Sequence, residues 1–519
     1  MLPLRIITHR RPELLSGALF SWARALAARQ RVSRAGSALV PEAQAERQGI
    51  LVFDDSPEPA FQRANAAAAE KAAAATGVPV RLVSRRERES LPGSLPPESA
   101  ALAAALRFGL GGPEGGLPAG GPGSNRNGTL LFSIGEKAVS VDDDAVFSFR
   151  CFKPGIAGRL APGGGLGPGG RDLPVFLPAA PGRVAAMTEA FAGDPFESFE
   201  AVLGRSFDDG GPGDGLPEPL GPGHFRSELK RHEPKRSGPK RFGPVKIAMG
   251  GIHGGRWFGS PHGIFDVEPE LQTLAWEDEE GYRAARENPD SLLLSPNLLL
   301  TERHFFVTTL FGFDARDILP PFFPGIRNED GVWAFLVRCC HPRSPVCHLP
   351  LAVEHHRDSR RPFTPADYED FTVGAGKVML HLLHFIYDRL PEDEPGEILA
   401  GLGRGLSSCP AISKRNWREL ITGLLMESER RRREILEARL EAPEAAGYWT
   451  SDLENHIRSL RKAALSAEPY RPREFLPLGR KGETAFRDYV ARCGELLEAW
   501  PEIWAWAAGA ESEILRLRR

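Results

Sequence analysis

Three consecutive aspartates, Asp142, Asp143 and Asp144, follow the short apolar run AVSV at residues 138–141. Carboxylates this close together repel one another unless a cation compensates their charge. Mg²⁺ and Mn²⁺ prefer carboxylate oxygen, and they often bind through one or two carboxylates together with phosphate oxygens of a substrate. Such a cation also neutralises a diphosphate as it leaves. The alternative is an exposed turn, because Asp is common in turns.

A second acidic pair, Glu329 and Asp330, stands directly before the apolar segment GVWAFLV at residues 331–337. Carboxylates are favourable near a helix N-terminus, because the backbone N–H groups there point toward them. A charged helix start therefore explains this pair without any chemistry.

Histidines and arginines gather in the segment LPLAVEHHRDSRRPF at residues 349–363. Arginine matches oxyanions with two parallel hydrogen bonds, so the arginines of this segment are candidates for phosphate contacts. An exposed histidine pair often has no ligand role, and that interpretation stays open. The candidates are His355, His356, Arg357, Arg360 and Arg361.

The cysteines and histidines of residues 339–356 offer a structural zinc site as an alternative, because zinc prefers Cys and His. They are Cys339, Cys340, His341, Cys347, His348, His355 and His356. No CxxC spacing occurs among them, and the spacing does not indicate the tetrahedral convergence that zinc needs. Six cysteines in 519 residues also do not form a disulfide framework.

Short apolar runs alternate with helical patterns in the first part of the chain, which predicts a parallel sheet covered on both faces. The predicted strands are Leu4–Thr8, Ile50–Phe53, Val78–Val83 and Ala138–Val141. In such sheets ligands bind beyond the carboxyl ends of the strands. We therefore expect three polar clusters to meet at one rim. They are Thr8-His9-Arg10, Asp54-Asp55-Ser56 and Asp142-Asp143-Asp144.

The rest of the chain divides by composition. Residues 151–245 are rich in Gly and Pro, and their segment Arg226–Arg241 is strongly basic. We expect a solvated insertion there, or alternatively a lid or clamp on an anionic acceptor or membrane surface. Residues 363–519 have helical periodicity. The segment GLGRG at 401–405 lacks a preceding strand pattern, so we predict a turn between helices rather than a nucleotide loop.

The segment GSNRNGTLLFSIGEKAVSVDDD at residues 123–144 resembles the GT-A glycosyltransferases, close to family 2. In that family a small residue and Arg-Asn precede an apolar helix, a Gly and a strand that ends in an acidic DXD motif. The openings ITHRRPELL and ILVFDDSP resemble the first and second strands of the family. The resemblance covers about the first third of the chain.

The resemblance implies a nucleotide-sugar pocket and a metal site. The pocket would be lined by Thr8, Arg10, Asp55, Arg126, Asn127, Asp142 and Asp143. Asp142 and Asp144 would be the DXD pair that holds Mn²⁺ or Mg²⁺, with Asp144 the direct ligand and the register open by one position. Many GT-A enzymes have a later histidine at the metal or the diphosphate, which implies His355.

RNEDGVW at residues 327–333 looks like the acidic motif of the family at the acceptor side, which supplies the general base in inverting members. Such a base takes the proton from the acceptor hydroxyl as it attacks the anomeric carbon. We assign that role to Asp330, with Glu329 orienting the acceptor or the donor. The opposite assignment of the two carboxylates stays open.

These observations predict an α/β protein with a GT-A domain, Rossmann-like and mostly parallel, and a helical C-terminal domain. Residues 1–150 would be the nucleotide-sugar half, 151–245 the insertion, 246–362 the acceptor-side half and 363–519 the helical domain. The expected activity is metal-dependent transfer of a sugar from a nucleoside diphosphate sugar, with inversion, to a glycan, peptide or small-molecule acceptor. A sugar nucleotidyltransferase and a non-catalytic sugar-nucleotide-binding or scaffold protein are the alternatives.

Composition favours a soluble protein with a substantial core, since 41% of the residues are hydrophobic. The formal net charge of -3 does not give the basic footprint of a nucleic-acid binder. The first residues do not have the pattern of a signal peptide, and we find no apolar run long enough to span a membrane. We therefore expect a cytoplasmic protein whose only membrane contact would be peripheral.

Overall fold

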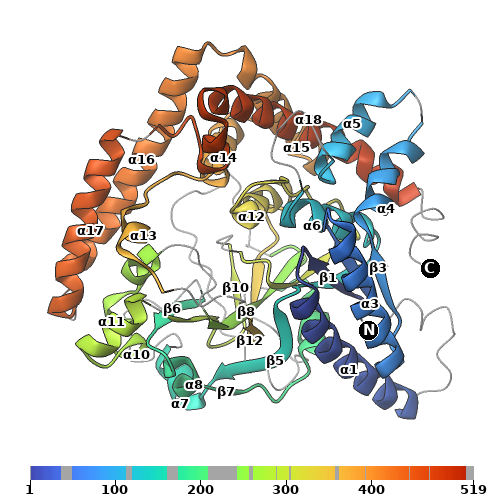
Figure 1. The fold of residues 1–519 in the computed structure, drawn as a ribbon, viewed down its shortest axis with the longest axis horizontal. Coiled ribbons are helices and arrows are strands. Elements are labelled where there is room, and N and C mark those ends of the chain that lie inside the picture. Colours follow the sequence, from blue (N-terminus) through green and yellow to red (C-terminus); the bar gives the residue numbers. More distant parts are fainter. Residues whose placement is uncertain are drawn as a thin grey trace.

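A mixed β-sheet runs through the molecule, and its N-terminal part is parallel (Figure 1). The computed structural model describes residues 2–36, 49–96, 98–112, 120–160, 174–207, 242–255, 261–287, 289–302, 306–356, 362–391, 393–442, 445–466 and 468–509. The parallel strands are, in spatial order, β3 (Val80–Val83), β2 (Ile50–Asp54), β1 (Leu4–Thr8) and β4 (Lys137–Asp142). The sequence predicted all four, with small shifts at their ends.

Alternating side chains of these strands enter two different hydrophobic clusters, as the two faces of a pleated strand require. Ile6 and Val52 belong to one cluster, and their neighbours Ile7 and Phe53 belong to the other. Helix α1 (Pro12–Gly36) covers the first face together with α3 (Pro59–Thr76), against which it packs (Figure 1). Apolar residues of α1 recur at helical spacing toward that face: Leu15, Ala18, Leu19, Trp22, Ala23 and Leu26.

The opposite face of the sheet is covered by the helices between β3 and β4, by α12 and by helices of the C-terminal region. Short helices follow β3 and lead to β4: α4 (Arg85–Ser90), η1 (Leu91–Ser94), α5 (Ala100–Gly109) and α6 (Pro122–Leu131). Helix α12 (Glu329–Cys340) contributes Val332, Trp333 and Leu336 to the same cluster. Its Trp333 stacks on Phe322 with ring centroids 4.3 Å apart.

The sheet continues beyond β4 with pairing that is mostly antiparallel. The next strands in spatial order are β11 (Leu310–Asp314), β8 (Ile247–Gly255), β12 (Val346–His355), β5 (Ala145–Phe152) and β7 (Thr188–Ala190). Strand β9 (Asp290–Leu294) pairs with β8 and with β6 (Val175–Ala179), and β10 (Leu299–Thr301) pairs with β12. Of these further pairs only β8 with β12 is parallel within the described residues. The predicted α/β class is confirmed, and the sheet is mixed.

A short turn after β4 carries the chain to another part of the sheet. Asp143 and Asp144 form this turn, and β5 begins at Ala145. Strand β5 pairs with β12 and not with β4, so that Ala145 lies opposite His355. The turn therefore connects the parallel part of the sheet with the carboxyl end of β12.

The C-terminal region is helical, as predicted, and it shares a hydrophobic cluster with α12 and the sheet. Its main helices are α14 (Ala375–Tyr387), α15 (Pro395–Ser407), α16 (Lys414–Leu440), α17 (Gly447–Ser466) and α18 (Gly482–Gly509). Shorter helices of the second half are η3 (Pro261–Asp266), η4 (Pro269–Leu271), α10 (Gln272–Ala275), α11 (Glu279–Glu287), α13 (Pro365–Glu369), η5 (Cys409–Ala411) and η6 (Arg473–Lys481). The α16–α17 pair lies on the opposite side of the molecule from α1 and α3 (Figure 1).

Two local predictions were wrong. The GLGRG segment is not a turn but lies inside α15, where a Cβ at Gly403 would come within 2.7 Å of the carbonyl oxygen of Gly494. Its glycine therefore permits a close approach of α15 to α18. Residues 174–207, expected to belong to a Gly- and Pro-rich insertion, contain β6 and β7 of the sheet and the helices α8 (Arg183–Met187) and α9 (Pro195–Val202). Helix α7 (Pro154–Leu160) precedes them, and the basic segment Arg226–Arg241 lies outside the described residues.

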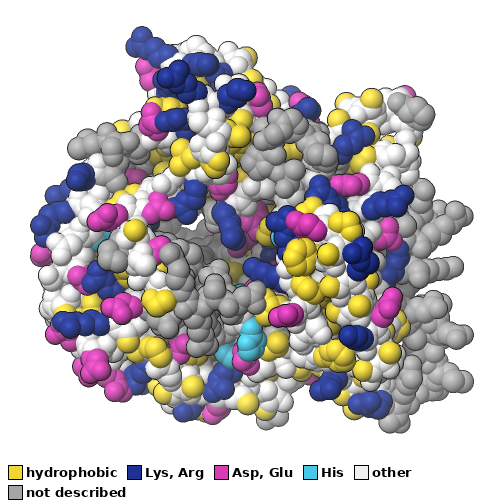
Figure 2. All heavy atoms as spheres, viewed as in Figure 1, with side chains coloured by type: hydrophobic (Ala, Val, Ile, Leu, Met, Phe, Trp, Pro, Cys, Tyr) yellow, Lys and Arg dark blue, Asp and Glu magenta, His cyan; other side chains and the backbone are white. Residues whose placement is uncertain are grey.

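Charged side chains of both signs are interspersed over the face of the molecule in Figure 2. Among the described helices, none combines the length and the apolar character needed to cross a membrane. The polar clusters that the sequence predicted to meet lie at the rim of the sheet where β1, β2 and β4 end.

Candidate functional site

The three polar clusters at the ends of β1, β2 and β4 meet, as the parallel topology predicted. The hydroxyl of Thr8 donates to Oδ2 of Asp143 at 2.6 Å. The Nδ1 atom of His9 lies 3.2 Å from the backbone oxygen of Asp55. The amide of Asn125, on α6, donates to the carbonyl of Thr8 at 3.0 Å. One rim therefore joins β1 to both of its neighbours and to α6.

The three aspartates of the triplet are held by Arg126, Thr8 and Arg11. Asp142 accepts from Nη2 of Arg126 at 2.9 Å. Asp143 contacts Thr8, and its Oδ1 accepts from Arg11 at 3.3 Å. Asp144 accepts from the same Nη1 atom of Arg11 at 2.7 Å. The triplet is therefore compensated by two arginines, of which Arg126 is 3% exposed and Arg11 is 45% exposed.

His355, at the end of β12, approaches the triplet from the other side. Its Nε2 atom lies 3.3 Å from Oδ1 of Asp144, an oxygen that makes no well-oriented hydrogen bond to a described residue. Both side chains are nearly buried, and Nδ1 of His355 also lacks a hydrogen-bond partner among the described atoms. The backbone N–H of His356 donates to the carbonyl of Asp144 at 2.7 Å, which fixes the two segments together.

Burial and mutual repulsion shift the pKa values of the triplet. Burial raises the pKa of Asp142, against the charge of Arg126. Burial and the neighbouring Asp144 raise the pKa of Asp143 to about 7. Burial also opposes ionisation of Asp144, but the His355 ring and the Arg11 charge outweigh it, so its pKa lies below the ordinary value. Asp144 is thus the carboxylate of the triplet that is most stabilised in its charged form.

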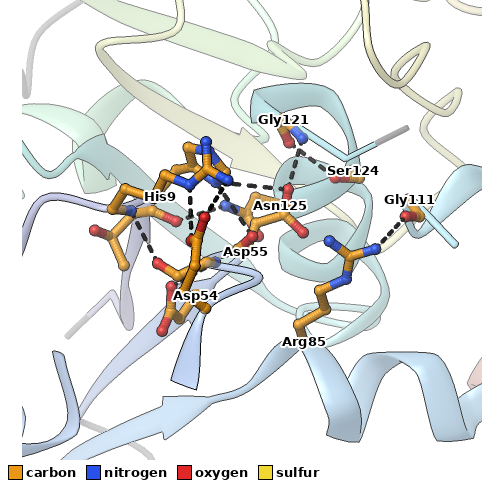
Figure 3. A network of polar contacts seen from close by, with 12 residues as sticks. His9, Asp54, Asp55, Arg85, Gly111, Gly121, Ser124 and Asn125 are labelled. Carbon is orange, nitrogen blue, oxygen red and sulfur yellow. Dashed lines mark hydrogen bonds and ion pairs between the residues drawn. The ribbon is translucent and has the colours of Figure 1, made fainter. Parts of the chain in front are cut away.

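Asp55 is held by the protein itself. Its Oδ1 atom accepts from Nη2 of the fully buried Arg88 at 3.1 Å. Its Oδ2 atom accepts from the backbone N–H of Gly121 at 2.6 Å (Figure 3). Gly120 has a φ of 79°, and a Cβ there would come within 2.7 Å of the same Oδ2. Asp55 therefore fixes the loop before α6, close to His9 and Asn125 (Figure 3).

The second acidic pair lies at the start of α12. Glu329 is buried and accepts from Nη1 of Arg126 at 2.8 Å. Asp330 is half-buried, accepts from the backbone N–H of Gly331 at 2.9 Å, and forms no ion pair within the described part of the chain. Burial and the charge of Asp330 raise the pKa of Glu329 to about 7, against Arg126. Burial also raises the pKa of Asp330.

Arg126 therefore connects the two acidic sites. Its guanidinium donates to Asp142 from one nitrogen and to Glu329 from the other, and it lies 5.8 Å from the ring centroid of Phe322. A planar guanidinium with a fixed fork can bridge two carboxylates in this way, whereas a lysine ammonium lacks that planar fork. The end of β4 and the start of α12 are thus parts of one site.

The segment before α12 is held by hydrogen bonds to its backbone from distant residues. The carbonyl groups of Leu319 and Pro324 accept from Trp500 and Tyr489 of α18, at 2.7 and 2.8 Å. Glu474, in η6, accepts from the backbone N–H of Arg327 at 3.2 Å and of Ala375 at 2.8 Å. The C-terminal helical region therefore positions the approach to Glu329 and Asp330.

Two residues that the resemblance assigned to the nucleotide pocket have other partners. Arg10 has a φ of 57°, is 47% exposed and pairs with Glu58. Asn127 is buried, and its amide bonds only to the backbone of Gly109 and Phe322 in the described residues. Asn127 is therefore a structural residue that positions the loop before α12, and it does not face the aspartates.

Sequence reasoning missed Arg11 and Arg88. Arg11 follows Arg10, which the resemblance assigned to the nucleotide pocket. The left-handed backbone at Arg10 decides which of the two arginines faces the triplet. Arg88 comes from a charged helix whose sequence gives no sign of burial. His356 is exposed and pairs with Glu354 at 3.2 Å, while Arg357, Arg360 and Arg361 lie outside the described residues.

The donor set fits a cation that completes its coordination with ligand oxygens. Within the described part of the chain, no three His, Cys, Asp or Glu side chains converge as a metal site made only of protein ligands requires. This also argues against the zinc alternative there, since Cys339, Cys340 and Cys347 are buried and His341 bonds to the carbonyl of Ile318 at 2.7 Å. Asp144 and His355 nevertheless present an oxygen and a nitrogen side by side, and Mg²⁺ and Mn²⁺ often use few protein ligands with substrate phosphates.

Comparison with known proteins adds no assignment to this geometry. No protein-family model matches the chain. No curated protein matches it either.

Proposed function

We propose that the protein is a metal-dependent glycosyltransferase of the GT-A type. It would move a sugar from a nucleoside diphosphate sugar to an acceptor hydroxyl, or to another nucleophile, with inversion at the anomeric carbon. The observation that carries the proposal is the bridge of Arg126 between Asp142, at the end of β4, and Glu329, at the start of α12. This bridge combines a cation-seeking acidic triplet with a second carboxylate pair in one site.

The donor side of the proposed site is the triplet and its neighbours. Asp144 and His355 would hold Mn²⁺ or Mg²⁺ with Asp142 nearby, and the buried Oδ1 of Asp144 lacks a well-oriented hydrogen bond to the described residues. When bound, such a cation neutralises the charge that develops on the leaving diphosphate. Thr8 fixes Asp143 through its hydroxyl, so that the turn keeps its shape beneath the ligand.

The acceptor side is the Glu329–Asp330 pair. Asp330 has no ion-pair partner among the described residues and is half-buried, so its carboxylate is free to take a proton from an acceptor. Its raised pKa makes it a stronger base than an ordinary aspartate. Glu329 is fixed by Arg126, which suits a residue that orients a substrate.

The proposed step can be written with these groups. The acceptor oxygen forms a bond to the anomeric carbon while the bond from that carbon to the diphosphate oxygen breaks. The electron pair of the broken bond leaves with the diphosphate, and the acceptor proton passes to Asp330. General-base help of this kind contributes about 10²–10⁴-fold to a rate.

A binding screen tests the donor side without knowledge of the acceptor. Nucleoside diphosphates and their sugars would be titrated by calorimetry in Mn²⁺ and in EDTA. We expect binding that requires the metal and that Asp144→Ala weakens about tenfold or more, because the carboxylate is the proposed ligand. Asp388→Ala, an exposed aspartate at the end of α14, is the matched control. Equal affinity in EDTA would contradict the proposal.

A further inference from the structure

Arg11 occupies an unusual place beside the aspartate triplet. Its carbonyl accepts from the backbone N–H of Leu15 at 2.9 Å, so its main chain is fixed at the start of α1. Its side chain reaches back, and one atom, Nη1, lies 2.7 Å from Oδ2 of Asp144 and 3.3 Å from Oδ1 of Asp143. The left-handed φ of 57° at Arg10 turns the chain so that Arg11 points this way.

The two arginines of the triplet differ in their freedom to move. Arg126 is 3% exposed and is held at both ends of its guanidinium by Asp142 and Glu329. Arg11 is 45% exposed, and its guanidinium contacts Asp143 and Asp144 through the same nitrogen. A side chain with a fixed backbone, a half-exposed head and contacts through one nitrogen can leave its partners without disturbing the fold.

A divalent cation held by Asp144 and His355 would share one carboxylate with the Arg11 head, the cation toward Oδ1 and the guanidinium on Oδ2. A divalent cation and a guanidinium about 4–5 Å apart repel each other by several kcal/mol, even at the effective dielectric constant of about 20 that suits protein surfaces. A cation held by Asp144 and His355 must therefore push the guanidinium away from Oδ2. The displaced guanidinium stays within reach of the same ligand, and guanidinium groups match phosphate oxygens bidentately.

We propose that Arg11 is a displaceable counter-cation of this site. It neutralises Asp143 and Asp144 while no metal is bound, and it turns to the diphosphate of the donor when a divalent cation takes its place. This inference rests on the proposed function for the identity of the donor, but its first half concerns the metal alone. It predicts that metal and donor bind cooperatively, because displacing Arg11 weakens metal binding and the diphosphate then gains Arg11 as a partner.

The test measures two affinities that should move in opposite directions. Mn²⁺ alone would be titrated into the parent protein and Arg11→Ala, followed by uridine diphosphate and guanosine diphosphate at saturating Mn²⁺. We expect Arg11→Ala to bind Mn²⁺ about tenfold more tightly and the nucleotide about tenfold more weakly. Arg11→Lys should lie between the two in both affinities. Arg24→Ala removes the same charge from an exposed position of α1 and should change neither by more than about twofold.

The outcomes separate this inference from the proposed function. Unchanged or weaker Mn²⁺ binding by Arg11→Ala would overturn the counter-cation role, provided that circular dichroism shows the parent protein and Arg11→Ala to be folded alike. Tighter Mn²⁺ binding accompanied by a rise in nucleotide affinity would overturn it as well. Tighter Mn²⁺ binding in a protein whose parent binds no nucleoside diphosphate would support the metal half and overturn the proposed function instead.

Discussion

The two acidic sites of this protein are built from the same kind of side chain but are stabilised differently. The triplet Asp142–Asp144 lies in a turn between two strands, where Arg11 and Arg126 compensate its charge and the ring of His355 lies 3.3 Å from Asp144. The pair Glu329–Asp330 lies at a helix start, where a single arginine compensates Glu329 and burial raises both pKa values. Burial acts on both sites, but the triplet has two arginines while Asp330 has no ion pair among the described residues.

The difference suggests what each site can do. The carboxylates of the triplet are already arranged around positive charge, so a metal ion can take the place of the half-exposed Arg11 guanidinium. A half-buried carboxylate with a raised pKa and no ion pair among the described residues, such as Asp330, is suited to take and release a proton. Arg126 belongs to both sites, so it is the residue through which a change in one should be felt in the other.

The largest expected effect separates the two sites by their function. Asp330→Asn keeps the shape of the side chain but removes the proton acceptor, so transfer should fall by about 10²–10⁴-fold. Donor affinity should barely change, because the proposed donor contacts are at the triplet. Asp144→Asn should weaken donor and metal binding as well as turnover. Single-turnover transfer and donor titration of both variants make the comparison.

Glu329→Gln identifies which carboxylate of the pair is the base. Near-parental transfer by Asp330→Asn together with an inactive Glu329→Gln would reverse the two roles. If neither variant loses activity, the pair is only a helix start, and the division of labour between the sites is wrong.

Much of this arrangement could be predicted from the sequence, because the pattern that indicates it lies within a few consecutive residues of each strand. Strands β1, β2 and β4 are short apolar runs followed at once by polar residues, and parallel topology alone brings such ends together. The contact of Thr8 with Asp143 follows from that rule. The adjacency of His355 and Asp144 was implied only by resemblance, because it depends on β5 pairing with β12 across about 200 residues.

What could not be predicted depends on single backbone angles or on long-range packing. The left-handed turn at Arg10 decides that Arg11 and not Arg10 contacts the triplet, and neighbouring arginines give no sign of it. The glycines of GLGRG look like a turn until α18 packs against them. The bonds from Glu474, Tyr489 and Trp500 to the segment before α12 join residues whose sequence positions carry no common pattern.

A second prediction breaks the link between the sites. Arg126→Met leaves the buried Glu329 and the half-buried Asp142 without their cation, and removing one partner of a buried ion pair typically costs about 3–5 kcal/mol. We expect a loss of that size in the free energy of unfolding by urea. Arg126→Lys should recover only part of it, because an ammonium group lacks the fork that bridges both carboxylates.

A matched triple variant shows whether the cost comes from unpaired charge. Asp142→Asn and Glu329→Gln remove the two carboxylates, so adding them to Arg126→Met should restore most of the lost stability. A triple variant as unstable as Arg126→Met would mean that packing of Arg126 on Phe322 is what matters, and that the two sites are not coupled by charge.

The smallest effect concerns pH and distinguishes burial from ion pairing at the acceptor side. The pKa of Glu329 is raised to about 7 in the folded protein, above its ordinary value of 4.5, so the folded state binds this proton more tightly than the unfolded state. Stability from this group is therefore present at low pH and is lost as pH rises from about 4.5 to about 7, by about 3 kcal/mol. In Glu329→Gln this part of the decrease should disappear.

Melting temperatures of both proteins in EDTA at half-unit steps between about pH 4.5 and 8 provide the measurement. Asp143 titrates in the same window, so the variant should retain a smaller slope and not a flat profile. If the two profiles run parallel, the Arg126 ion pair and not burial sets the charge of Glu329, and the acceptor side is organised by cations just as the triplet is.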